Sequence, residues 1–118
     1  MQKVTPALKI TDYEKSIYFY IEGLGFQIDW EHRFEPGFPV FMQITRDEFT
    51  IYLTEHEGDC QVGGLVHFLV SDVDNLYNEL RKKNIVKEPP FEVIDGLRML
   101  SVEDPDGNEL RFMNPKEI

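Results

Sequence analysis

Two aspartates, Asp12 and Asp72, stand sixty residues apart (72 − 12), and the residues around them follow one pattern. Each aspartate comes directly after a short apolar strand pattern and directly before a stripe of apolar residues at helical spacing. The stripes consist of Tyr13, Ile17 and Tyr20 in the first copy and of Val73, Leu76, Tyr77 and Leu80 in the second. This internal repeat predicts a pseudo-symmetric sheet structure, with a cleft built from two similar halves.

Both halves continue in the same order, with one strand, one helix and then three strands. In the first half the strands are expected at Lys3–Thr11, Phe26–Trp30, Val40–Ile44 and Phe49–Thr54, and the helix runs from Asp12 to about Glu22. In the second half they are expected at Leu65–Val70, Phe91–Ile94, Leu97–Glu103 and Glu109–Met113, with a helix after Asp72. The polar segment Glu55–Gly64 connects the halves. The sequence therefore predicts an α+β fold of two βαβββ modules, at about residues 1–57 and 62–118, whose sheets curl around a cleft.

Local signals support these boundaries. Asp12 and Asp72 are expected to cap their helices, because an aspartate carboxylate accepts hydrogen bonds from the free amides of the first turn. Gly23 and Gly25 are expected to end the first helix. Asp104–Asn108 combines proline and glycine in a turn between the last two strands. At 118 residues the chain is long enough for one domain with its own core, and a second domain is not required.

The formal charge of 12 − 22 = −10 repels phosphate, so it argues against nucleic acid or an anionic membrane as a partner. Such a charge would steer a cationic ligand inward, although a charge that serves only solubility explains it equally well. Cys60 is the single cysteine, which rules out an intrachain disulfide and a zinc site of paired thiolates. The chain start lacks a signal-peptide pattern, and no apolar run approaches the length of a membrane span. We therefore expect a cytoplasmic protein.

Three segments together resemble the vicinal oxygen chelate superfamily, which includes glyoxalase I, extradiol dioxygenases and bleomycin-resistance proteins. They are Thr5–Leu8, Asp12–Tyr20 with the following Leu24–Phe26, and Asp104–Leu110. Within the superfamily, Trp30–Gly37 and Leu53–Asp59 look most like the bleomycin-resistance branch. That branch sequesters a cationic glycopeptide antibiotic as a homodimer, without a chemical step, and so confers antibiotic resistance.

Enzymes of this superfamily hold a divalent metal on histidine and glutamate side chains from four strands. The resemblance places Thr5, Tyr52, Leu65 and Arg111 at those four positions. None of them is a good ligand for Zn²⁺, Ni²⁺ or Fe²⁺, and Arg111 would repel a metal ion. We therefore expect no metal, no cofactor and no catalytic residue, and we favour a metal-free homodimer that binds a small, cationic molecule over an enzyme.

Candidate ligand-binding residues come from several features. Aromatic side chains gather around the turn at Pro36–Gly37, where they suit planar or cationic ligands; packing in the core or at a dimer interface is the alternative. Tyr52 is expected to project into the cleft, and so is His67 if its neighbours face the helix. The full set of candidates is Thr5, Trp30, His32, Phe34, Phe38, Phe41, Tyr52, Glu55, His56, His67, Arg98 and Arg111.

Several of these candidates also have explanations that involve no ligand. The acidic loop of Glu55, Glu57 and Asp59 fits a solvated charge run as well as a contact to a cation. Arg98 and Arg111 can each be paired with a neighbouring acid. Two other functions also stay open. One is a metal-dependent lyase, isomerase or dioxygenase with unanticipated ligands such as His32, His56 and Glu55, and the other is a binding module for a ligand unrelated to antibiotics.

Overall fold

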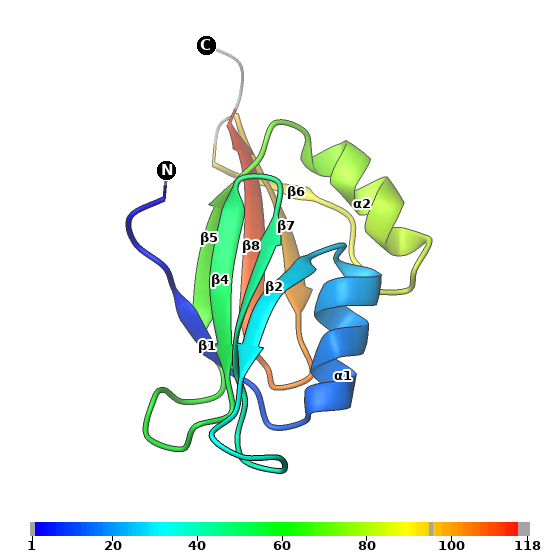
Figure 1. Ribbon diagram of the computed structural model, residues 1–118. Coiled ribbons are helices and arrows are strands. Elements are labelled where there is room, and N and C mark those ends of the chain that lie inside the picture. The colour runs from blue at the N-terminus through cyan, green and yellow to red at the C-terminus, as the bar shows by residue number, and fades with distance from the viewer. Residues whose placement is uncertain (1, 95, 116–118) are drawn as a thin grey trace.

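The chain folds into two four-stranded sheets with a helix from each half on the same side (Figure 1). The computed structural model describes residues 2–94 and 96–115. The first sheet has the order β1-β4-β3-β2, and the second has the order β5-β8-β7-β6. The strands are β1 (Ala7–Lys9), β2 (Gln27–His32), β3 (Phe41–Arg46), β4 (Phe49–Thr54), β5 (Leu65–Leu69), β6 (Phe91–Ile94), β7 (Leu97–Glu103) and β8 (Glu109–Pro115). The predicted α+β fold of paired βαβββ modules is confirmed.

The two modules repeat each other in strand register as well as in strand order. In the first sheet Ala7 of β1 lies beside Tyr52 of β4 in a parallel pair. In the second sheet His67 of β5 lies beside Arg111 of β8, also in a parallel pair. The spacings are 67 − 7 = 60 and 111 − 52 = 59, so Tyr52 and Arg111 occupy equivalent places in the two halves.

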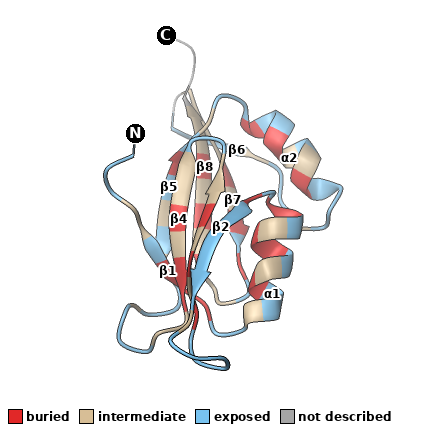
Figure 2. Ribbon diagram, in the orientation of Figure 1, coloured by how far each residue is buried: buried red, intermediate tan, exposed pale blue. Residues whose placement is uncertain are grey.

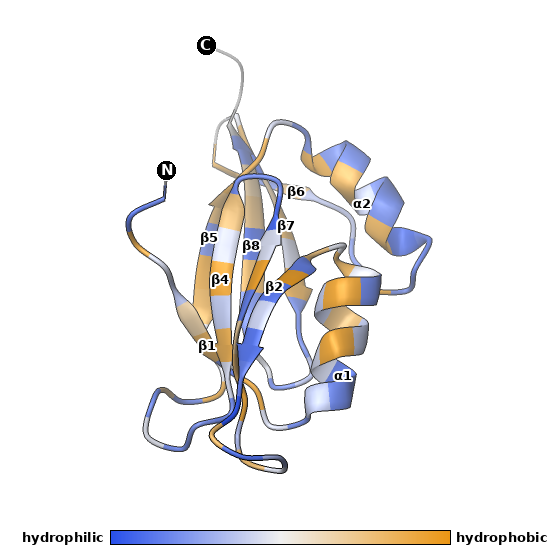
Figure 3. Ribbon diagram, in the orientation of Figure 1, coloured by the Kyte–Doolittle hydropathy of each residue, from blue (hydrophilic) through white to orange (hydrophobic). Residues whose placement is uncertain are grey.

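The predicted helix caps are present at both repeated aspartates. Asp12 accepts a hydrogen bond from the amide of Lys15 at 3.1 Å, and Asp72 accepts one from the amide of Asn75 at 3.0 Å. Helix α2 (Val73–Arg81) then buries Val73, Leu76 and Leu80. Figure 3 shows the resulting division of α2, hydrophobic toward the sheets and hydrophilic outside.

The first helix departs from the expected geometry. Its α-helical part, α1 (Tyr13–Ile17), continues as a π-helix, η1 (Tyr18–Gly23). The amide of Leu24 accordingly donates to the carbonyl of Phe19, five residues back, at 2.8 Å. Gly23 ends this segment in close contact with Ile85, because a Cβ built on Gly23 would lie 2.3 Å from Ile85 Cδ1. A glycine is therefore required here for packing between the modules.

Two strands differ from their predicted extents for local reasons. β1 is shorter than Lys3–Thr11, because Pro6 has no amide proton to donate and can only accept from Tyr52. β2 carries a β-bulge between Ile28 and Trp30. These two side chains therefore lie on opposite faces, because Ile28 pairs with Ile44, whereas Trp30 pairs with Gln43.

The side of each sheet that faces the helices forms the core. Figure 2 shows buried residues in red along the central strands and the inner sides of the helices, whereas β2 is exposed along its length. The buried apolar strand residues alternate with residues of the opposite side, which we call the open face. Core residues on the strands are Leu8, Met42, Ile44, Ile51, Leu53, Phe68, Leu100, Val102, Leu110 and Phe112.

Hydrogen bonds around Asp104 join the two modules. The buried Asp104 carboxylate accepts from Tyr20 Oη at 2.6 Å and from Asn108 Nδ2 at 2.8 Å. Asn108 Nδ2 also donates to the carbonyl of Lys9 at 2.8 Å, and its Oδ1 accepts from the amide of Gly64 at 2.7 Å. The segment predicted as a hairpin turn is thus also a buried link between the β7–β8 connection and the first module.

Other contacts between the modules are a bidentate ion pair and an aromatic group. Arg46 donates to both carboxylate oxygens of Glu79, at 2.9 and 3.0 Å. The ring of Phe68 lies 5.1 Å from that of Phe49 and 4.9 Å from that of Phe112, measured between centroids. In the described part of the chain, no helix is both long and apolar enough to cross a membrane.

The link through Tyr20 leads to a stability prediction. Tyr20→Phe removes one donor to a buried carboxylate, so we expect the free energy of unfolding to fall by about 1–3 kcal/mol in urea denaturation. Tyr18→Phe is the matched control, because Tyr18 is an exposed tyrosine of the same helical segment; it should change stability by less than about 0.5 kcal/mol. Equal losses in the two variants would contradict the role assigned to the Tyr20–Asp104 hydrogen bond.

Candidate ligand-binding site

A packed group of aromatic rings covers the open face of the first sheet. Trp30 stacks on Phe41 with ring centroids 5.9 Å apart and an angle of 18° between the planes. Tyr52 lies 4.9 Å from Phe41 and 5.9 Å from Trp30. The Trp30 side chain nevertheless remains 41% exposed. These three rings from β2, β3 and β4 offer a preformed surface for stacking against a planar group.

The group extends toward the lower end of the sheet through three further rings. His32 packs edge-on against Phe34 at 5.0 Å, and His56 lies 6.4 Å from both Phe34 and Phe41. We call Trp30, His32, Phe34, Phe41, Tyr52 and His56 the aromatic face. All six were predicted as ligand-binding residues, and the structure brings them together on one surface.

The β-bulge in β2 creates this arrangement. It places Trp30 opposite Gln43, on the same side as Phe41 and Tyr52. Asp29, the extra residue in the bulge, accepts a hydrogen bond from Gln43 Nε2 at 2.9 Å and another from the Thr45 hydroxyl. The bulge is therefore held from two neighbouring positions of β3, and with it the orientation of the indole ring.

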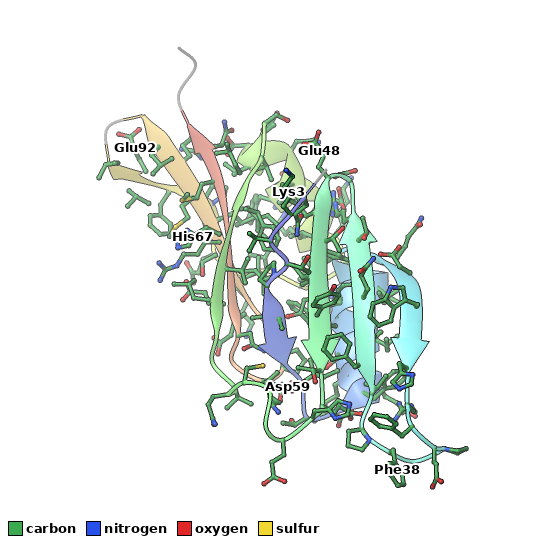
Figure 4. All side chains as sticks on the ribbon, turned by 60° about the vertical axis from the view of Figure 1, so that its left-hand side comes forward. Lys3, Phe38, Glu48, Asp59, His67 and Glu92 are labelled. Atoms are coloured by element: carbon green, nitrogen blue, oxygen red, sulfur yellow. The ribbon has the colours of Figure 1, made fainter. Side chains whose placement is uncertain are left out.

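The loop between β4 and β5 folds over the same end of the open face. The Lys9 ammonium donates to the carbonyl of His56, and Thr54 Oγ1 donates to Asp59 at 2.7 Å. Both Lys9 and Thr54 are buried as a result, although they lie on the open face. Asp59 is visible in this loop in Figure 4, which looks onto the open faces with α1 behind the first sheet. The predicted acidic run is therefore in part a folded loop, since Asp59 has a structural partner.

Glu55 also has structural partners. Its Oε1 accepts from the amide of Val40 at 2.9 Å and lies 3.6 Å from Arg33 Nη1. His32 and His56 contact Phe34 from two sides. Within residues 2–94 and 96–115, no three histidine, cysteine, aspartate or glutamate side chains are grouped to hold a metal ion. The alternative set of His32, His56 and Glu55, which lies among these residues, thus does not form such a group.

The four positions that the resemblance assigns to metal ligands lie two on each module. Tyr52 belongs to the aromatic face, and half-buried Thr5 precedes β1. Leu65, at the start of β5, is 47% exposed. Arg111 donates from Nε to Glu109 Oε2 at 2.7 Å and from Nη2 to Oε1 at 3.2 Å. The Arg111 hydrogen bonds, and then one from Ser101, hold the pKa of Glu109 below its ordinary value.

The open face of the second sheet is more apolar than that of the first. Leu65, Leu69 and Phe91 are large apolar side chains exposed there, beside the Arg111–Glu109 pair. His67 is exposed on the same face, while its neighbour Phe68 is buried toward the helices. Figure 4 shows His67 on this second sheet, well apart from Phe38 at the lower end of the first. The predicted orientation of His67 is therefore correct.

Two predicted candidates lie away from the open faces. Arg98 belongs to the helix side of β7 and donates to Asp74 of α2 at 2.7 and 3.1 Å, so its inclusion among cleft residues was wrong. The alternation along β7 carries this side chain to the opposite face from Met99. Phe38 lies in the β2–β3 loop and lines an open hollow of about 760 Å³ at the end of the molecule.

That end hollow includes three residues that the sequence did not single out. Lys9, Tyr13 and Arg33 line it together with Phe38 and Glu55. The Arg33 guanidinium lies 5.1 Å from the centroid of the Tyr13 ring. Burial, and then the hydrogen bond to Glu31, raises the pKa of Tyr13 to about 12. For Lys9 the sequence did contain a usable signal, because Lys9 is two residues after Ala7 on the same strand. The two side chains therefore share the face on which Tyr52 lies.

Comparison with protein families decides the family. A family model described as "Glyoxalase superfamily protein" matches residues 1–118. The chain belongs to the glyoxalase superfamily. The resemblance inferred from the sequence is confirmed, and the open-face positions can be compared with those of other superfamily proteins.

Several known proteins resemble this chain in sequence or in fold. An uncharacterized protein, YraH of Bacillus subtilis (strain 168), is 29% identical over 113 residues, which span 86% of this chain and 88% of that protein. The crystal structure of a bleomycin resistance determinant encoded on transposon Tn5 has a TM-score of 0.77 with 24% identity, covering 100% of both chains. A bleomycin-binding protein complexed with bleomycin has a TM-score of 0.75 with 23% identity, covering 98% of this chain and 100% of that one. This glyoxalase superfamily chain therefore shares its fold with bleomycin-binding proteins.

The ion pair between Arg111 and Glu109 leads to a prediction about the pKa of Glu109. Because its folded-state pKa is lowered, Glu109 adds stability that is present above its unfolded pKa and is lost as the pH falls through the folded value. We expect Arg111→Gln to raise the Glu109 pKa toward its ordinary value in a carbon-13 NMR titration of the carboxyl groups. Arg98→Gln removes an arginine from the opposite face and should leave the Glu109 titration unchanged. An unchanged Glu109 pKa in Arg111→Gln would contradict the assigned cause.

Proposed function

We propose that this protein binds and sequesters a small cationic molecule with a planar aromatic group, as a homodimer and without a chemical step. The main support is the aromatic face, where Trp30, Phe41 and Tyr52 pack against one another on the protein surface. Rings held in place before binding lose little conformational freedom when a ligand stacks on them. A planar cation gains both stacking and cation–π attraction on such a surface.

The charge of the protein supports a cationic ligand. The net charge of −10 attracts cations to the surface from solution. Glu35 and Glu57 are exposed in the loops that border the aromatic face. Glu31 lies beside buried Met42 on the helix side of β2, where it accepts from Tyr13 Oη at 2.8 and 2.9 Å, so it does not face the site. The border of the site can therefore contact a positive group while the rings contact a planar one.

The side chains at the positions where related enzymes carry metal ligands support binding without a metal. Tyr52 contributes its ring to the aromatic face, and Arg111 is held in a bidentate pair by Glu109. An arginine guanidinium carries only donors and so cannot ligate a divalent cation. The shared fold with proteins described as bleomycin-binding and bleomycin-resistance proteins makes an antibiotic of that class the first ligand to test. The single cysteine fits a place of action in the cytoplasm.

A second copy of the chain is the partner that suits the second sheet. Leu65, Leu69 and Phe91 leave its open face apolar and exposed, with Leu69 64% exposed. An apolar sheet face of this kind is normally covered. Covering it with the aromatic face of another copy would bring His67 and Arg111 of that second sheet to the border of the ligand site. Each dimer would then contain two equivalent sites.

Ligand binding can be measured through Trp30, the single tryptophan. We expect bleomycin to change Trp30 fluorescence and to give a saturable heat in titration calorimetry at micromolar protein. Tyr52→Ala should weaken binding by about tenfold or more, because aromatic anchors dominate such contacts. Tyr77→Ala, on α2, is the control and should bind as the unaltered protein does. Absence of binding at micromolar protein would reject bleomycin as the ligand.

The dimer has its own test. Light scattering after size-exclusion chromatography should give about twice the chain mass of 13.9 kDa. Leu69→Glu places a charge on the apolar face and should shift the mass toward that of one chain. Tyr18→Glu alters an exposed aromatic residue on the helix side and should leave the dimer intact. A monomer in the unaltered protein would reject the dimeric site.

A further inference from the structure

A second hollow lies on the helix side of the molecule, away from both open faces. It has a volume of about 520 Å³ and is bounded by α1 and η1, by Asn84 and Ile85 after α2, and by the connection between β7 and β8. Both modules therefore contribute to its walls. Its volume falls within the range of about 300–1,000 Å³ that is usual for small-molecule sites.

The walls of this hollow are largely apolar. Tyr18 and Phe19 come from η1, Ile85 from the segment after α2, and Pro105 from the β7–β8 connection. The Tyr18 side chain is 60% exposed, so the face of its ring is available to a ligand. Ile85 can take this position because Gly23 has no side chain to displace it. The π-helix that contains Tyr18 is a geometry found frequently at functional sites.

The charges around the hollow are mostly negative. Three carboxylates, from Glu14, Glu103 and Asp104, line it, together with the single ammonium group of Lys15. Among the described residues, none of these three carboxylates forms an ion pair. Asp104 is hydrogen-bonded by Tyr20 and Asn108, which are neutral and leave its charge uncompensated. Burial, and then the charge of Asp104, raises the pKa of Tyr20 well above its ordinary value, which agrees with a negative local field.

We propose that this hollow is a second ligand site, for a small organic cation with an apolar or aromatic body, such as a quaternary ammonium compound. The cation would lie near Glu14 and Glu103, and its body would pack against Tyr18, Ile85 and Pro105. An exposed tyrosine ring adds cation–π attraction. The site does not depend on the proposed function, because α1 lies on the opposite side of the first sheet from the aromatic face (Figure 4).

Benzyltrimethylammonium is a suitable probe, because it combines a quaternary cation with one ring. In a titration of the full nitrogen-15-labelled chain, we expect saturable NMR shifts at the backbone amides of Glu14 to Phe19 and of Glu103 and Asp104. Benzyl alcohol should bind more weakly, and phenylmethanesulfonate should give no saturable shifts at these amides. Absence of saturable shifts with benzyltrimethylammonium, or equal binding of the alcohol, would overturn the proposal.

Substitutions of exposed residues test the contributions of the tyrosine ring and of the charges separately, without a large loss of stability. Tyr18→Ala and Glu103→Gln should each weaken binding by about two- to fivefold, whereas Lys15→Gln should strengthen it by removing a repelling charge. Trp30→Ala should leave binding in this hollow unchanged while it impairs the aromatic face. Loss of binding in Trp30→Ala, or shifts confined to β2, β3 and β4, would place the probe on the aromatic face and overturn the second site.

Discussion

The hydrogen bonds of the Asp104 carboxylate are the constraint on which the relation between the two modules depends. The two sheets are separate, and no ladder of backbone hydrogen bonds joins them in the described part of the chain. Side chains must therefore fix one module against the other. Asp104 and Asn108 do this from a single turn, because Tyr20 reaches Asp104 from the first module and Asn108 reaches the backbone of Lys9. Arg46–Glu79 and the ring of Phe68 add two further points of attachment.

With the modules fixed in this way, the two sides of each sheet have different roles. The helix side supplies the core, and the open face is left outside it. On the first sheet the open face is aromatic, and on the second it is apolar with one arginine–glutamate pair. The two faces therefore differ in kind, since one carries a packed group of aromatic rings and the other carries exposed apolar side chains beside a localised charge pair.

Much of the fold could be predicted from the sequence, because its signals are local. The caps at Asp12 and Asp72 and the alternation in β4 and β5 follow from neighbouring residues alone. The bulge at Asp29 could not be predicted in this way, because it depends on partners in β3 that are fourteen and sixteen residues distant. The same holds for the close approach of Ile85 to Gly23, two residues that are 85 − 23 = 62 positions apart in the sequence.

In the candidate site, too, some features follow from the sequence and others depend on tertiary contacts. His67 was placed on an open face from the alternation of its strand, Tyr52 from the position that the family resemblance gives it, and the aromatic residues of β2 and β3 from their clustering around one turn. Arg98 could not be separated from Arg111 in the sequence, because both follow apolar strand residues and only tertiary contacts show that Arg98 reaches Asp74. The burial of Lys9 likewise depends on a loop that begins more than forty residues later, whose carbonyl at His56 accepts from its ammonium group.

The shared ladder register has an evolutionary consequence. Tyr52 and Arg111 occupy equivalent places in the two halves, yet one packs in a group of aromatic rings and the other is paired with a glutamate. If the halves arose by duplication of one module, their core positions have stayed apolar while their open faces have diverged. A change on an open face alters the chemistry of the exposed surface and leaves the hydrophobic packing intact. The fold can therefore acquire a new ligand through a few substitutions in either half, independently of the other.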